Sequence, residues 1–248
     1  MAPKEDPEDD GQEQGKLDAA GRTLMRFVQN VVSNGVGPIT GSVAWAEDRL
    51  RRVQGERYDV GRFGARGEGD IETDIAKVIS RLIKESVAAA GSTGFVTGLG
   101  GFATLPVSVP ANVAGALIIN ARLAGGIAYL RGYNLDDPHV QAMIPLVTLG
   151  AGAQTALAAI STQIGVKLSE QALKNVSIDL IRKINRKVGF MLLAKYGTKR
   201  AAVTLAKAIP FVGGLVSGAV DAGLTAAVGK AAKRWFDLGG TSSPVPVL

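Results

Sequence analysis

Hydrophobic side chains recur at helical spacing along most of the chain, and two long stretches carry no charge. Residues 70–90 show this spacing most clearly, because their large aliphatic residues fall on one side of a helix and their charged residues on the other. Asp70 is placed to cap that helix. Residues 86–121 and 140–166 contain no Asp, Glu, Lys or Arg. Such stretches must be buried, either in protein or in lipid.

The same spacing predicts further helices and indicates the fold class. The other predicted helices cover residues 17–33, 42–54, 111–130, 169–196, 198–208 and 211–236. No segment alternates apolar and polar residues for long enough to predict a strand. We therefore expect an all-α protein, a compact multi-helix bundle with Gly/Ala-rich buried central helices.

Composition divides the chain into four parts. We expect a disordered acidic tail over residues 1–18, N-terminal helices with an Arg/Gly-rich loop over 19–69, a helical domain over 70–236 and a flexible tail over 237–248. Residues 1–16 have no apolar core like that of a signal peptide. Together with the absence of cysteine, this favours a cytoplasmic protein.

Glycine spacing in the first charge-free stretch predicts close helix packing. Glycines at 91, 94, 98 and 101 recur every three or four residues, which lets helices approach backbone to backbone. Residues 98–103 also match the loose glycine pattern of dinucleotide sites. However, prolines at 106 and 110 end any following helix, and the next acidic residue is Asp136. We expect no cofactor.

The single histidine, His139, is the main candidate for catalysis. It follows Asp136 and Asp137, so a hydrolase could use it as a general base oriented by a neighbouring carboxylate. The simpler interpretation is structural, since Asp136 or Asp137 can cap a helix that begins near Pro138. One histidine without cysteine offers too few ligands for a metal. We assign no catalytic residue and no metal site, and the sequence favours a non-enzymatic protein.

Positive charge collects near the C-terminal end. Residues 167–236 hold 13 basic and only 3 acidic side chains. A basic run within them comprises Arg182, Lys183, Arg186, Lys187, Lys195, Lys199 and Arg200. Its like-charged i,i+4 pairs are mildly destabilising in a helix, so we interpret the run as a site for anionic lipid headgroups. A solvated helix face is the simpler alternative, and nucleic acid is not expected because no aromatic residues interleave with the basic ones.

Two isolated charges lie within apolar helices, Arg122 and Asp221. A buried charge is costly unless it is paired. We therefore predict a buried charge pair between Arg122 and Asp221, which would join their two helices. The alternative is that Arg122 extends to the surface and Asp221 faces solvent.

Four segments share their order and spacing with a known family. They are residues 101–111 (GFATLPVSVPA), 121–138 (ARLAGGIAYLRGYNLDDP), 184–190 (INRKVGF) and 209–214 (IPFVGG), followed by Asp221. Over roughly residues 70–235 the chain resembles the EcsC-type family. That family is named after a protein encoded beside a bacterial ABC transporter. The resemblance implies a bacterial, membrane-linked context rather than a particular reaction.

None of the apolar stretches is a clear membrane span, which needs about 20 mostly apolar residues. Residues 140–164 are the best candidate, although Pro145, Gln154 and Thr155 interrupt them. We predict a cytoplasmic helical protein that binds the anionic inner face of the cell membrane peripherally and supports envelope transport or stress processes. A membrane transporter or another envelope protein is a further candidate partner. The alternatives are a hydrolase using His139 and an integral or pore-forming protein.

Overall fold

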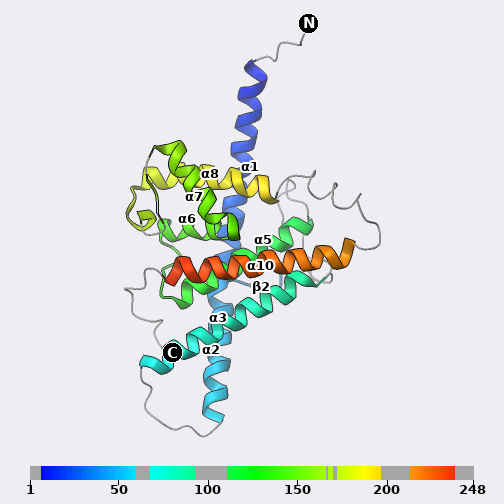
Figure 1. The fold of residues 1–248 in the computed structure, drawn as a ribbon, viewed down its shortest axis with the longest axis vertical. Coiled ribbons are helices and arrows are strands. Elements are labelled where there is room, and N and C mark those ends of the chain that lie inside the picture. Colours follow the sequence, from blue (N-terminus) through cyan, green and yellow to red (C-terminus); the bar gives the residue numbers. More distant parts are fainter. Residues whose placement is uncertain are drawn as a thin grey trace.

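The computed structural model describes residues 7–59, 68–92, 111–165, 167–169, 172–196 and 213–237. Within these ranges, eight α-helices pack against one another, accompanied by two 3-10 helices and one small hairpin (Figure 1). The predicted all-α bundle is therefore confirmed. The glycines at 94, 98 and 101, the prolines at 106 and 110, the predicted helix over 198–208 and the tail from 238 lie outside the described residues.

The elements follow one another in a simple order along the chain. The α-helices are α1 (Pro7–Ser33), α2 (Ser42–Asp59), α3 (Glu68–Gly91), α5 (Ala111–Leu130), α6 (Pro138–Val147), α7 (Ala153–Ile164), α8 (Ile178–Tyr196) and α10 (Gly213–Asp237). The 3-10 helices are η2 (Gly150–Gly152) and η3 (Ala172–Asn175), and the strands are β1 (Gly35–Val36) and β2 (Ile39–Thr40).

Helix α5 forms the centre of the bundle, and α10 crosses in front of it in Figure 1. It contacts α1, α2, α3, α6, α8 and α10. Its bounds are those predicted, and from residue 115 onward only Ala116, Arg122 and Tyr129 are partly exposed. The first charge-free stretch thus contributes protein core over this helix. Small residues allow the tight fit: a Cβ added to Gly125 would lie 2.5 Å from Ser42 Oγ.

The N-terminal region differs from the prediction in two places. Helix α1 begins at Pro7, so most of the acidic segment expected to be disordered is helical. Proline suits the first helical position, and acidic residues near a helix N-terminus interact favourably with its dipole. Strands β1 and β2 form a short antiparallel hairpin where no strand was expected. Gly35 permits this turn because its φ is +81°, and a Cβ there would lie 1.9 Å from Ile39 O.

The predicted amphipathic helix over 70–90 is confirmed as α3, with a slightly earlier start. Because α3 begins at Glu68, Asp70 lies inside the first turn and is not the cap. Ile75, Val78, Ile79 and Leu82 are buried, as the spacing predicts. Helix α2 likewise continues to Asp59, into the predicted loop.

The second charge-free stretch folds into α6, η2 and α7. Asp137 caps α6 by accepting a hydrogen bond from the backbone N–H of His139, and Pro138 opens the helix, as predicted. Within the described residues no single helix is long and apolar enough to cross a membrane. By length and composition alone, one bent pair could: residues 138–147 and 150–164, which meet at 119°.

The predicted helix over 169–196 is divided. Residues 172–175 form η3, and α8 starts only at Ile178. Ser177 precedes that start, and its carbonyl accepts from the Ile181 N–H at 3.0 Å. Leu173 is nevertheless buried, so the apolar stripe continues across the break although the helix does not.

Candidate functional site

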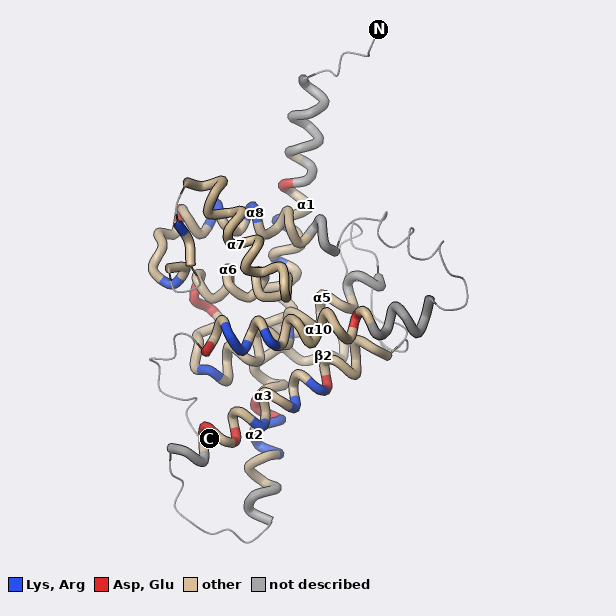
Figure 2. The backbone as a smooth tube through the Cα atoms, in the orientation of Figure 1, with Lys and Arg blue, Asp and Glu red and all other residues tan. Residues whose placement is uncertain are grey.

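The basic residues of α8 lie on its exposed side. Four of the predicted residues are exposed, namely Arg182, Lys183, Arg186 and Lys187. The opposite side enters the core through Ile181, Ile184, Val188 and Leu192. The side chain of Lys195, and residues Lys199 and Arg200, lie outside the described part of the chain. Figure 2 shows the Lys and Arg positions along α8.

Two large apolar side chains share this exposed side. Phe190 is 50% exposed and Ile178 is 45% exposed. Lys183, Lys187 and Phe190 are spaced i, i+4 and i+7, which places them in one row along the helix. Ile178 begins the adjacent row, which continues through Arg182 and Arg186. Each cationic row on α8 therefore carries an exposed apolar residue at one end.

The four cations differ in how far they are neutralised. Arg182 pairs with Asp179 at 2.8 Å, and Arg186 lies 3.8 Å from Asp18 of α1. Lys183 and Lys187 form no ion pair with any described residue. Both arginine pairs include strongly exposed side chains, and such pairs contribute little to stability. The lysine row is thus the most available part of the positive surface.

Helix α1 supports α8 from behind through a close glycine contact. A Cβ added to Gly189 would lie 2.9 Å from the backbone oxygen of Gly21, and one added to Gly21 would lie 3.1 Å from the Gly189 carbonyl carbon. The two backbones touch without an intervening side chain. This contact fixes α8 on the bundle, with its basic side outward.

The structure does not join Arg122 to Asp221, so the predicted charge pair is corrected. Arg122 Nη2 donates a hydrogen bond to Thr40 Oγ1 at 2.8 Å, and the guanidinium lies 4.2 Å from the Trp45 ring centroid. Asp221 is half-buried on α10, where burial raises the pKa of its carboxyl. An indole face and a hydroxyl accommodate Arg122 instead of a carboxylate.

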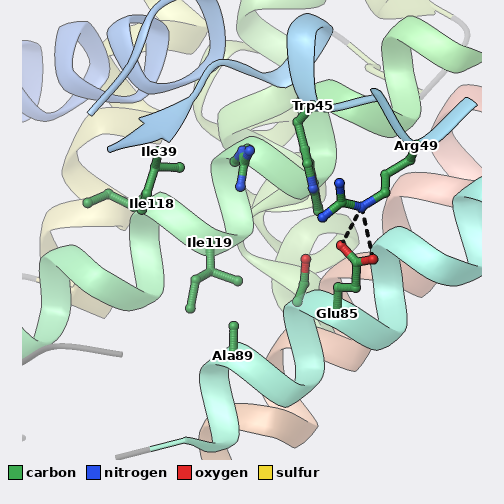
Figure 3. Close-up of a pocket in the computed structure, with 9 residues that line it drawn as sticks. Ile39, Trp45, Arg49, Glu85, Ala89, Ile118 and Ile119 are labelled. Atoms are coloured by element: carbon green, nitrogen blue, oxygen red, sulfur yellow. Dashed lines mark hydrogen bonds and ion pairs between the residues drawn. The ribbon is translucent and has the colours of Figure 1, made fainter. Parts of the chain in front are cut away.

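Arg122 lines a cavity of about 230 Å³ among α2, α3, α5 and β2. Figure 3 shows Ile39, Ile118, Ile119 and Ala89 on one side and Trp45 with the Arg49–Glu85 pair on the other. Ser86, which is 4% exposed, completes the lining. The cavity therefore combines an apolar wall with a charged edge.

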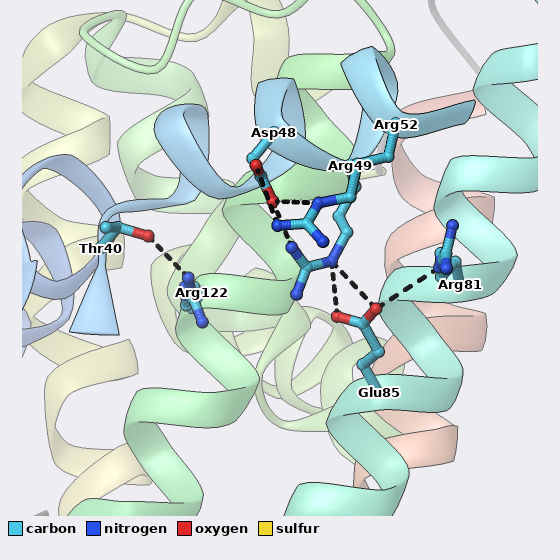
Figure 4. A network of polar contacts seen from close by, with 7 residues as sticks. All are labelled: Thr40, Asp48, Arg49, Arg52, Arg81, Glu85 and Arg122. Carbon is cyan, nitrogen blue, oxygen red and sulfur yellow. Dashed lines mark hydrogen bonds and ion pairs between the residues drawn. The ribbon is translucent and has the colours of Figure 1, made fainter. Parts of the chain in front are cut away.

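A network of polar contacts surrounds that charged edge (Figure 4). Arg49 Nε contacts both carboxylate oxygens of Glu85 at 2.9 Å, and Arg81 lies 3.6 Å from the same carboxylate. Asp48 pairs with Arg49 and Arg52, which lowers the pKa of its carboxyl, chiefly through the hydrogen bond from Arg52. Glu85 is therefore already engaged by two arginines.

Arg122 is the poorly neutralised member of this group. Its Nε is buried and has no hydrogen-bond partner among the described residues. Burial, aided by the nearby positive charge of Arg49 and opposed by Glu85, lowers the pKa of Arg122 to about 10. This cavity was not predicted from the sequence. Two signals for it were present: Trp45 and Arg49 are spaced i,i+4 on one predicted helix, and Glu85 is the last charged residue before the charge-free residues 86–121.

His139 joins two parts of the fold through both ring nitrogens. Nδ1 lies 2.9 Å from Asp137 Oδ1, and Nε2 lies 2.9 Å from the Val176 carbonyl oxygen. The Val176 contact, together with Asp137 and against the effect of burial, raises the pKa of His139. Burial would raise the pKa of Asp137, but its hydrogen bonds from His139 lower it. This arrangement fastens the start of α6 to the segment before α8 and leaves neither nitrogen open to a substrate.

Within the described residues, no three His, Asp or Glu side chains lie close enough together to hold a metal ion.

Comparison of the chain with family models, with curated proteins and with solved structures finds no match.

Proposed function

We propose that the protein associates peripherally with an anionic membrane surface through the exposed side of α8. The observation that supports this most directly is the row formed by Lys183, Lys187 and Phe190, two cations without ion-pair partners among the described residues followed by a half-exposed aromatic ring. A solvated helix face would account for the lysines, and Phe190 is the feature that favours lipid, because it lies in the same row as they do. A lipid interface accommodates both kinds of group.

The expected free energy of membrane binding is estimated from the exposed side chains of α8. Each basic residue near an anionic leaflet contributes about 1 kcal/mol, so Lys183 and Lys187 together contribute about 2 kcal/mol, or roughly 30-fold in affinity. Arg182 and Arg186 add less while Asp179 and Asp18 remain beside them. Burying the Phe190 ring adds an apolar term of about 1.5 kcal/mol or more, which salt does not screen.

In this proposal, the protein binds the inner face of the cell membrane. A transporter or another envelope protein in that membrane is a candidate binding partner. The EcsC-type resemblance is what suggests that setting. The hydrolase alternative has little support, because both nitrogens of His139 already have partners.

Co-sedimentation with vesicles tests the proposal. The protein is mixed with vesicles of phosphatidylcholine, with and without phosphatidylglycerol, at ionic strengths of about 0.01 and 1 M, where charges act over about 30 and 3 Å. We expect binding that requires phosphatidylglycerol and weakens strongly with salt. Pelleting that resists both salt and carbonate would instead favour the integral alternative, with the bent α6–α7 pair as its candidate span.

Two matched variants locate the surface. Lys183→Gln/Lys187→Gln and Lys230→Gln/Lys233→Gln each remove two exposed lysines, the first pair from α8 and the second from α10. Only the α8 variant should lose roughly 30-fold in affinity. Equal losses in the two variants would show that net charge matters and that the α8 surface does not. Phe190→Ala should weaken the salt-resistant part of binding.

A further inference from the structure

The cavity beside Arg122 has the composition of a binding site for a small amphiphilic anion. It is separate from the α8 surface, since its lining comes from α2, α3, α5 and β2. It opens at the protein surface, and its volume of about 230 Å³ exceeds the roughly 150 Å³ that holds benzene in an engineered protein cavity. A hydrocarbon chain of several carbons with a charged head therefore fits.

Local charge indicates the sign of the ligand. Arg49 and Arg81 neutralise Glu85, and Asp48 is held by Arg49 and Arg52. These contacts leave Arg122 without a carboxylate, while its Nε is buried with no partner among the described residues. A guanidinium that contacts no carboxylate and lines a cavity favours an anionic ligand there, because hydrogen bonds between ionised groups are the stronger ones.

The chemical class of the ligand follows from the opposite wall. The opposite wall is formed by residues with apolar side chains, namely Ile39, Ile118, Ile119 and Ala89. An inorganic anion would leave those side chains in contact with water. Trp45 covers one face of the Arg122 guanidinium, and both residues line the cavity. A planar carboxylate matches the flat guanidinium through paired N–H donors better than a point charge does.

We propose that this cavity binds a medium-chain monocarboxylate, with its carboxylate on Arg122 and its hydrocarbon chain along Ile118, Ile119 and Ala89. Ser86 also lines the cavity and carries a hydroxyl, which can donate a hydrogen bond. The charged residues of the lining, Arg49, Glu85 and Arg122, carry a net charge of +1, which favours a monoanion over a more highly charged ligand. The site does not depend on the membrane proposal.

Calorimetric titration of the full chain with octanoate tests the site. We expect a dissociation constant on the order of 0.1–1 mM for a ligand of this size. Two probes resolve its features: 1-octanol keeps the chain and lacks the charge, and inorganic phosphate keeps a charge and lacks the chain. Both should bind at least about tenfold more weakly than octanoate. Equal binding of octanol would overturn the role of Arg122, and equal binding of phosphate would overturn the role of the apolar wall.

Variants place the ligand. Arg122→Gln should weaken octanoate binding at least about tenfold, and Ala89→Leu should do the same by filling the space for the hydrocarbon chain. Lys230→Gln on α10 removes an exposed charge elsewhere and should leave the affinity unchanged. If Arg122→Gln does not fold, Ala89→Leu still decides the matter, because its Arg122 is intact. Unchanged octanoate affinity in folded Ala89→Leu would refute the site.

Discussion

Replacing Gly125 by alanine tests whether close backbone packing around α5 holds the bundle together. An added Cβ would lie 2.5 Å from Ser42 Oγ, 2.9 Å from Val32 Cγ1 and 3.0 Å from Ser42 Cβ. Carbon atoms in good contact are separated by about 3.5–4.0 Å, so α1 or α2 must move by roughly 0.5–1 Å. Overpacking of this kind typically costs about 1–3 kcal/mol.

Two further terms adjust this value. Ser42 Oγ donates a hydrogen bond to the Arg122 carbonyl oxygen at 3.1 Å, and displacing the hydroxyl would forfeit about 1 kcal/mol. In the opposite direction, alanine is intrinsically better than glycine inside a helix by about 1 kcal/mol. These terms nearly cancel, so we expect Gly125→Ala to lower the free energy of unfolding by about 1–3 kcal/mol.

Gly223 provides the matched control on α10. It is exposed, and a Cβ added there would meet nothing within 4 Å. Gly223→Ala should therefore raise the free energy of unfolding by up to about 1 kcal/mol. Urea unfolding followed by far-ultraviolet circular dichroism measures both changes, with the slope on denaturant expected to stay constant. If Gly125→Ala matched or exceeded the wild type while Gly223→Ala was stabilised, the close packing inferred for α5 would be incorrect.

Three other substitutions probe different contacts. The folded pKa of His139 is raised above its unfolded value of about 6.5, so the stability that the protonated ring contributes is fully present below that value and is lost as pH rises through the folded pKa. His139→Gln should therefore flatten the fall in stability as pH rises above about 6.5, measured by urea midpoints. Trp235, 1% exposed, should cost about 3–5 kcal/mol on replacement by alanine, seen as a lower urea midpoint. Arg131 pairs with Glu72 of α3 and with Asp237 of α10, each at 2.8 Å. Because both carboxylates are substantially exposed, Arg131→Ala should lower the free energy of unfolding by about 1 kcal/mol. This loss should be smaller when the urea unfolding is repeated in high salt.

Hydrophobic spacing was sufficient to predict the helices that build the core. The stripe over 70–90 and the apolar segment over 111–130 correspond to α3 and α5, because burial of those side chains determines where each helix runs. Helix ends depend on weaker local terms. The extension of α1 to Pro7 rests on acidic residues near a helix N-terminus, a contribution of less than about 1 kcal/mol that apolar spacing does not register.

The break before α8 shows how a tertiary contact overrides a continuous stripe. Leu173 and Val176 keep the helical spacing of the residues that follow, yet the chain turns between them and Ile178. The Val176 carbonyl accepts a hydrogen bond from His139, a residue 37 positions earlier in the chain. Ser177 was a visible start signal, because serine commonly precedes the first turn of a helix. The anchoring bond could not be predicted from local sequence.

Arg122 shows why the cavity that it lines could not be predicted from the sequence. Its isolation in an apolar helix correctly indicated that it needs a partner, and electrostatics alone made a distant carboxylate the natural choice. The fold instead supplies the indole ring of Trp45 from α2 and the hydroxyl of Thr40 from the hairpin. Apolar spacing did not predict the hairpin, because each of its strands is only two residues long. Arginine, unlike lysine, can stack on an aromatic face and still direct N–H groups elsewhere. The partner that sequence reasoning sought inside the chain is therefore, in our proposal, a carboxylate that comes from outside it.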